Sequence, residues 1–159
     1  MLLAQLGTHA AARFAERLAP LGLAPRHAGV LRILERLTGA NQRVVAEALG
    51  LPPSRLVSLI DELERRGLVE RREDLEDRRS YALHLTARGT EVLEEIGRIA
   101  HRHGEDLCRT LDPREREELT ALLLRMIEGQ GLRAGIFSPA AGRSGRSDRA
   151  PPDTTGGER

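Results

Sequence analysis

Arginine is the residue type in this chain with the most evident chemistry to offer. All 25 basic residues are arginine, and none is lysine. A guanidinium group is a planar fork of N–H donors that can bind a phosphate or the edge of a guanine through two parallel hydrogen bonds. The net charge is only +1, so the chain as a whole does not attract a polyanion. Any binding of nucleic acid must therefore come from where individual arginines are placed.

The other reactive residue types give little support to catalysis or to metal binding. A single cysteine, Cys108, excludes an internal disulfide and an all-cysteine zinc site, and we expect it to be an inert buried thiol. His101 and His103 stand two residues apart in a predicted helix, so they point to different faces and do not form a zinc pair. The sequence also lacks a nucleophile elbow, a P-loop and a dinucleotide fingerprint. We expect no enzyme, no cofactor and no metal; a small hydrolase with an unrecognised site is the remaining catalytic alternative.

Length and composition describe one soluble domain with a tail. The chain has 159 residues, 40% of them apolar, which is enough for one core. Residues 134–159 are rich in Gly, Pro, Ser, Thr and Arg, so we expect a disordered tail after a domain at 1–133. A tail that touches DNA is the alternative to a dispensable one. No apolar run approaches the ~20 residues of a membrane helix, and the N-terminus lacks the pattern of a secretory signal. These features predict a cytoplasmic protein without a membrane partner.

The spacing of apolar residues predicts a mainly helical chain with one β-hairpin. Aromatic residues make up only 2% of the chain, so the core must be built from Leu, Val, Ile and Ala, which suits helices. Apolar residues recur at every fourth position in 2–18, and further helices are expected at about 25–37, 42–49 and 53–66, then from Thr86 and from Asp112. Strands are expected at 68–72 and 80–85, and the second alternates with a period of two. The predicted order is four helices, a hairpin and two helices.

Two short helices joined by a tight turn and followed by a hairpin form a winged helix-turn-helix. In such a motif Ala46 allows close helix contact, Gly50 takes the positive φ of the turn, and Leu56 and Leu59 anchor the second helix in the core. The segments around these residues resemble the MarR family of bacterial transcription regulators. The resemblance extends from about Leu23 to Met126 and rests on the stretches 45–51 (VAEALGL), 59–71 (LIDELERRGLVER), 74–80 (DLEDRRS) and 85–89 (LTARG).

The resemblance implies a dimeric DNA-binding regulator, often a repressor that a small ligand releases. An α-helix fits the major groove and reads bases with the side chains at its amino end. With its leucines buried, the second helix of the motif has Pro53, Ser54, Arg55 and Ser58 facing outward there. We assign Arg55 to guanine recognition, with a phosphate-only or solvated arginine as the alternative. The family usually has hydroxyl or basic residues where this chain has Val57 and Ser58, so the resemblance does not define the operator sequence.

The charged segment between the predicted strands is the second candidate for DNA contact. In the family's Asp-x-Arg motif the arginine, Arg79 here, enters the minor groove, and the aspartate, Asp77 here, orients it. A narrow minor groove attracts arginine through its negative potential. Arg78 stands beside them, and a solvated run of charges with internal ion pairs is the alternative. Phosphate contacts that position the protein are expected from Gln42, Arg43, Arg71 and Arg72.

The terminal helices are expected to form a homodimer. One winged unit makes too few contacts for strong specificity, whereas a two-fold dimer reads two half-sites. Apolar residues begin at the very start of the chain, where their burial needs a partner; packing within the chain is the alternative. We place the DNA-binding lobe at about 26–86 and the dimerisation helices at about 2–19 and 87–131. The expected dimer contacts are Leu2, Leu3, Leu6, Leu107, Leu111, Leu119, Leu122, Leu123 and Met126.

The resemblance also implies a small-molecule effector that binds between the two lobes. His27, at the start of the second helix, could hydrogen-bond an anionic or phenolic ligand, and Phe14 is the second candidate ligand residue. A histidine satisfied within the chain or by solvent is an equal alternative. The predicted function is thus a ligand-responsive repressor, bound as a homodimer to a pseudo-palindromic operator in double-stranded DNA. The alternative is a winged-helix module that binds another protein through its charged hairpin.

Overall fold

The computed structural model describes residues 1–73 and 81–131 and confirms the predicted fold class and order of elements. Four helices come first: α1 (Leu2–Leu18), α2 (Pro25–Arg36), α3 (Gln42–Leu49) and α4 (Pro53–Arg65). A short 3-10 helix, η1 (Ala19–Leu21), separates α1 from α2. The hairpin strands β1 (Val69–Glu73) and β2 (Tyr81–Leu85) are followed by α5 (Ala87–Leu107) and α6 (Pro113–Gly129).

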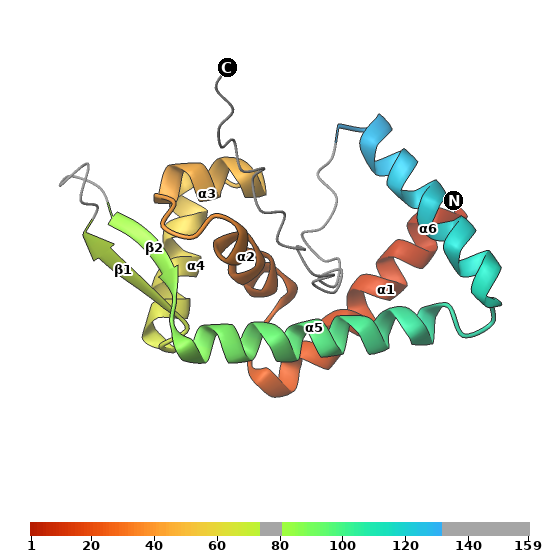
Figure 1. Cartoon of the computed structure of the whole chain (residues 1–159), viewed down its shortest axis with the longest axis horizontal. Coiled ribbons are helices and arrows are strands. Elements are labelled where there is room, and N and C mark those ends of the chain that lie inside the picture. The colour runs from red at the N-terminus through yellow and green to blue at the C-terminus, as the bar shows by residue number, and fades with distance from the viewer. Residues whose placement is uncertain (74–80, 132–159) are drawn as a thin grey trace, which may run out of the picture.

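The long helix α5 joins two lobes that lie toward its opposite ends (Figure 1). Near its start lie α2, α3, α4 and the hairpin, which together we call the hairpin lobe (residues 25–85). Toward its far end lie α1 and α6, which with the end of α5 we call the terminal lobe. Residues 19–24, the linker, lead from α1 into α2. The linker and α5 are therefore the two covalent connections between the lobes.

One apolar core fills the hairpin lobe and continues onto α5. It is formed by the facing sides of α2 and α4, which the helical period of the sequence predicts. α1 adds only residues from its carboxyl-terminal half, and α6 buries none of its residues. The largest fully enclosed side chains are Leu18, Leu31, Leu34, Leu56, Ile60, Leu63 and Leu83.

The hairpin has a third neighbour that the sequence did not reveal. β1 and β2 pair in antiparallel register along the whole of both strands. On the other edge of β2, Asn41 forms a bridge with Ala82, and Leu83 N–H donates to the Ala40 carbonyl oxygen at 3.0 Å. The predicted period-two alternation of the second strand is wrong, because Ala82 and Leu83 are both buried. The small side chain of Ala82 is enclosed since backbone runs beside β2 on both edges.

The start of α5 is fixed against the turn that precedes β1. Thr86 caps α5 as predicted: its Oγ1 accepts from Gly89 N–H at 2.9 Å and donates to the Gly67 carbonyl oxygen at 2.6 Å. A Cβ at Gly89 would come within 2.0 Å of the Leu68 carbonyl oxygen. Only glycine allows so close an approach. A direct backbone contact therefore sets the direction in which α5 leaves the hairpin.

Candidate nucleic-acid interface

The helix-turn-helix is built from a helix with a side-chain cap, a left-handed glycine and a helix that begins at a proline. The Asn41 side chain accepts a backbone hydrogen bond at 3.1 Å and so begins α3. α3 ends at Gly50, whose φ of 63° is left-handed, and Leu51 N–H returns to the Ala46 carbonyl oxygen at 3.0 Å. Pro53 then occupies the first turn of α4, where its missing N–H breaks no helical hydrogen bond. α4 consequently turns away from α3 within a few residues, with its amino end at the surface.

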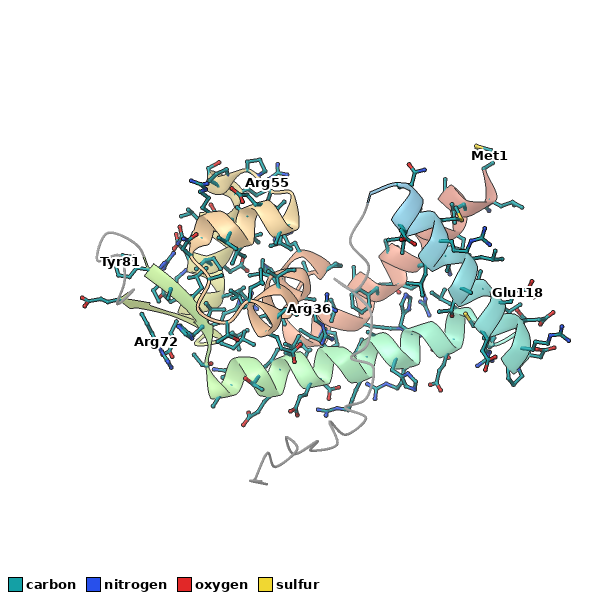
Figure 2. The ribbon with its side chains drawn as sticks, turned by 45° about the horizontal axis from the view of Figure 1, so that its top comes forward. Met1, Arg36, Arg55, Arg72, Tyr81 and Glu118 are labelled. Atoms are coloured by element: carbon teal, nitrogen blue, oxygen red, sulfur yellow. The ribbon has the colours of Figure 1, made fainter. Side chains whose placement is uncertain are left out.

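The amino end of α4 presents polar side chains to solvent, as the sequence predicted. Pro53, Ser54, Arg55 and Ser58 are all exposed, whereas Leu56 lies in the core. Figure 2 shows Arg55 at the outer edge of the hairpin lobe. No residue in the described part of the chain forms an ion pair with the Arg55 guanidinium. This guanidinium is therefore available to an external phosphate or base.

The same two helices carry exposed apolar side chains to which the sequence assigned no contact. Val57 on α4 is 38% exposed and Val44 on α3 is 41% exposed. An exposed aliphatic side chain on a recognition helix can contact the methyl group of thymine. The signal for Val57 in the sequence is that it falls outside the period of the buried leucines of α4.

The hairpin brings a second part of the chain to the same side of the molecule. Tyr81 is the first residue of β2. In Figure 2, Tyr81 and Arg55 both lie on the side of the molecule away from Met1. The Tyr81 side chain is exposed, at 55%. Three predicted DNA-contact residues lie outside the described residues, and their roles stay predictions: Asp77, Arg78 and Arg79.

Arg71, one of the predicted phosphate contacts, is paired with carboxylates within the chain. Its guanidinium donates to the carboxylate of Asp61 at 2.5 Å and also to that of Glu64, and only 20% of its side chain is exposed. The Gln42 side chain lies beside the same guanidinium, and its amide oxygen can accept from Arg71 Nε at 3.2 Å. Because two carboxylates of α4 already neutralise Arg71, this residue ties β1 to α4 and offers little charge to DNA. Gln42 shares that cluster.

Arg43 and Arg72 retain the exposure that phosphate contacts require. Arg43 Nε donates to Glu47 at 3.1 Å, and Arg72 Nε donates to Glu70 at 2.8 Å. Each pair lies within one element and is open to solvent. Exposed ion pairs contribute only ~0–1 kcal/mol, so a phosphate can replace the carboxylate at little cost.

His27 is buried between α2 and α4, and both of its ring nitrogens are engaged within the chain. Its Nδ1 accepts from Ala24 N–H at 3.0 Å, so the proton of the neutral ring is on Nε2, which donates to Glu62 at 3.0 Å. Burial lowers the pKa of His27, although Glu62 acts to raise it, and the hydrogen bond from His27 lowers the pKa of Glu62. Phe14 packs instead against His103, with the ring centroids 5.5 Å apart. Both ring nitrogens of His27 thus have hydrogen-bond partners within the chain, which is one of the two alternatives that the sequence left open. Ligand contact by His27 or Phe14 stays a prediction.

A cavity of about 430 Å³ lies between α2 and α5. Arg32 lines it although the residue is only 7% exposed, and its Nη1 donates to Glu35 at 2.9 Å. A Cβ at Gly97 would lie 3.9 Å from Arg32 Nη2, so the glycine leaves room beside this guanidinium. The only signal of the cavity in the sequence is a lone arginine in the otherwise apolar run 28–34. The lining residues are Arg32, Glu35, Leu93, Glu94, Gly97, Arg98 and His101.

The apolar residues assigned to dimerisation fall into two groups. Leu107, Leu111 and Leu119 are half-buried against the chain itself. The others are exposed, from 37% for Leu123 to 82% for Leu2, and Leu124 on α6 joins them at 47%. Soluble monomers rarely expose so many large apolar side chains together. The predicted residues that the described chain leaves exposed are Leu2, Leu3, Leu6, Leu122, Leu123 and Met126.

The structure offers no metal centre within residues 1–73 and 81–131, where no group of three or more His, Cys, Asp or Glu could hold an ion. The same residues form no helix with the length and apolar character needed to cross a membrane. Cys108 is a free thiol and is half-buried, whereas the sequence suggested full burial.

These features together define a winged helix-turn-helix protein. Proteins of this class place the second helix of the motif in the major groove of DNA. Here that helix is α4, its amino end is exposed, and the hairpin follows it directly. Comparison with known proteins identifies the family. A model of the MarR family matches residues 21–80.

A protein of Thauera aromatica, assigned as a transcriptional regulatory protein for the hcr operon, is 32% identical over 105 residues, which are 66% of this chain. The chain spans 63% of the length of that relative. A MarR transcriptional regulator from Methanosarcina mazei Go1 is 29% identical, with a TM-score of 0.72 over 81% of this chain and 93% of that one. The transcriptional repressor CouR, solved on a 23-mer DNA duplex, is 31% identical, with a TM-score of 0.71 over 79% of this chain and 89% of that one. The chain therefore belongs to the MarR family of transcription regulators.

Proposed function

We propose that this protein is a ligand-responsive repressor that binds a pseudo-palindromic operator as a homodimer. The observation that carries the proposal is the exposed amino end of α4, where the unpaired Arg55 guanidinium stands beside two serine side chains. A positively charged helix start with free N–H groups also favours a nearby phosphate. Arg79 and Asp77 would supply the minor-groove contact, and Arg43 and Arg72 the contacts to the DNA backbone.

The homodimer is supported by the uncovered apolar side chains of α1 and α6. A partner helix laid on Leu2 and Leu122 would remove them from water, which is worth ~1.5–3 kcal/mol for each fully buried leucine. CouR, a similar protein, is a repressor bound to a 23-mer duplex. A duplex of that length spans about two helical turns, which suits two half-sites one turn apart.

The response to a ligand is supported by the cavity between α2 and α5. Its buried Arg32 favours an anionic compound, because a carboxylate can receive paired hydrogen bonds from a guanidinium. The cavity lies between α2 of the hairpin lobe and the helix that leads to the terminal lobe. A ligand that fits only one relative position of these helices would shift the population away from the DNA-binding form.

The test is selection of DNA by the full chain from a pool of random duplexes, followed by titration of the enriched duplex. Arg55→Ala is expected to lower affinity about 5- to 150-fold, since a guanine contact is worth ~1–3 kcal/mol, and to relax selection at one base pair of each half-site. Arg79→Ala is expected to lower affinity for the A·T-rich flanks. The matched control is Arg102→Ala, an exposed arginine of α5, which should bind like the wild type.

Two results would overturn the proposal. If no duplex is enriched, the protein is not a sequence-specific DNA binder, and the protein-interaction module becomes the better reading. If Arg55→Ala and Arg79→Ala both bind the enriched duplex like the wild type, the protein binds DNA in another way.

A further inference from the structure

Three side chains of the hairpin lobe join the linker to the carboxyl-terminal half of α4. His27 holds the Ala24 amide through Nδ1, and its Nε2 donates to Glu62 Oε2 at 3.0 Å. The other oxygen of Glu62 accepts from Arg66 Nη2 at 3.1 Å. Arg66 Nη1 then donates to the Gly22 carbonyl oxygen at 2.6 Å. The hydrogen bonds thus begin and end on backbone groups of the linker, and we call this set the linker clamp.

The geometry of the linker depends on the clamp at both attachment points. Gly22 has a φ of 67°, and a Cβ there would lie 3.0 Å from Arg66 Nη1, so the guanidinium sits directly against the left-handed turn. Ala24 is the residue before α2 and has no side-chain group with which to cap the helix. Its N–H depends on the ring of His27. Both polar backbone groups are therefore held by side chains, and two of the three side chains come from α4 or its end.

The clamp and the proposed DNA contacts occupy opposite ends of the same helix. α4 has 13 residues, which at ~1.5 Å per residue makes it about 20 Å long. Glu62 and Arg66 lie at its carboxyl end, and Arg55 lies at its amino end. Because a helix of this length moves as a rigid unit, a rotation of the linker at one end displaces Arg55 at the other.

Resting on the proposed function, we propose that His27, Glu62 and Arg66 are positioning residues that fix the angle of α4 relative to α1. Because α1 belongs to the terminal lobe, which would form the dimer, this angle sets the separation of the two α4 helices. The clamp thereby determines which spacing between operator half-sites the dimer accepts. The clamp residues themselves would not contact the bases.

The experiment measures tolerance of half-site spacing. The enriched duplex is remade with its half-sites moved closer and farther apart by one base pair. Wild type is expected to prefer the original spacing at least tenfold. His27 and Arg66 donate to different oxygens of Glu62. In Glu62→Gln the side chain keeps its size, but one of these oxygens becomes an NH2 group that cannot accept, so one of the two hydrogen bonds is lost in this geometry. We expect the preference to fall at least threefold, while affinity for the original duplex changes less than threefold.

The matched control is Glu95→Gln. Glu95 is similarly exposed, 34% against 28% for Glu62, and also accepts hydrogen bonds from two side chains, those of Arg98 at 2.7 Å and Arg102 at 3.4 Å. Both of its partners are on α5, so its loss breaks no link between elements. We expect this variant to keep the wild-type preference for spacing. Arg66→Met, which removes the donors and keeps the aliphatic stem, is the second test variant and should behave like Glu62→Gln.

The outcomes separate this proposal from the proposed function. If wild type enriches no duplex, the proposed function fails. If wild type discriminates spacing and both Glu62→Gln and Arg66→Met discriminate it equally well, the operator binding stands and the positioning role is overturned. Equal loosening by Glu95→Gln would also overturn it, because loss of any ion pair would then suffice.

Discussion

Within residues 1–73 and 81–131, the hairpin lobe has a closed apolar core and the terminal lobe does not. The first has a closed apolar core, and in the described part of the chain no buried side-chain polar atom lacks a hydrogen-bond partner. The second exposes large apolar side chains on α1 and α6, and α6 buries none of its residues. Leucine is abundant in both lobes. Burial is therefore decided by whether a helix is packed on more than one side, and the described residues do not pack α6 in this way.

Their ion pairs differ in the same way. In the hairpin lobe some charged side chains link different elements, as Arg71 does between β1 and α4 and Arg66 between α4 and the linker. Along α5 most pairs stay within the helix, and Arg17 with Asp106, at 2.5 Å, is the pair that joins α1 to α5. Pairs between elements fix geometry, whereas exposed pairs within a helix add little.

The largest effect is expected from Gly89→Ala, which tests the close backbone contact between α5 and the hairpin lobe. The added methyl group would overlap the Leu68 carbonyl oxygen, and overpacking of this kind costs ~1–3 kcal/mol or more. We expect a loss of about 3 kcal/mol in the free energy of unfolding, measured by urea denaturation. Gly104→Ala is the control on the same helix, since nothing lies within 4 Å of its added Cβ. It should stabilise the protein by ~0.5–1 kcal/mol. Equal stability of both variants would mean that the contact at Leu68 adapts freely.

The next largest effect concerns the exposed apolar side chains of the terminal lobe. Leu122→Asp would place a charge in the proposed dimer contact, and loss of one buried leucine per subunit, at ~1.5–3 kcal/mol each, predicts at least a 100-fold weaker dimer. Analytical ultracentrifugation measures this dissociation constant. Leu124→Asp is the matched control, because Leu124 is equally exposed, at 47%, and lies two residues further along α6, about 200° around the helix from Leu122. We expect it to remain dimeric. Dissociation of both variants would show that a partner covers both faces of α6.

The smallest effect is a dependence of stability on pH that both lobes share. Burial lowers the pKa of His27 in the hairpin lobe and of His103 in the terminal lobe. The unfolded chain therefore takes up protons more readily than the folded one, so stability is complete above about pH 6.5 and falls as pH drops through the lowered pKa values. Glu62, Arg66 and Arg26 are the charged groups that act on His27.

Thermal melts between pH 7.5 and 5.5 measure this dependence. His27→Gln should remove part of the loss of melting temperature, and His27→Gln with His103→Gln should remove most of it. An unchanged slope in the double variant would assign the pH dependence to other groups.

Local patterns predicted much of the fold. The limits of α1 and α3 and the caps at Thr86 and Asp112 follow from apolar period and capping chemistry, both of which act within a few residues. The same period predicted that Arg55 faces solvent. The bridge between Asn41 and Ala82 joins segments that are distant in the sequence, so no pattern within either segment predicts it.

The parts of the site that escaped prediction depend on distant partners. The sequence predicts a phosphate contact for Arg71, and the carboxylates that pair with it belong to α4. His27 and Glu62 are 35 residues apart, and Gly22 and Arg66 are 44 apart. Such pairs depend on how the helices cross, which the spacing of residues in one segment does not specify.

Tyr81 gives the protein an optical property. The chain has one tyrosine and no tryptophan, so its tyrosine emission arises from a single ring at the first position of β2. That ring is open to solvent and far from Met1 (Figure 2). The unlabelled molecule therefore carries a built-in fluorophore at the hairpin, and a change in its quantum yield reports events there.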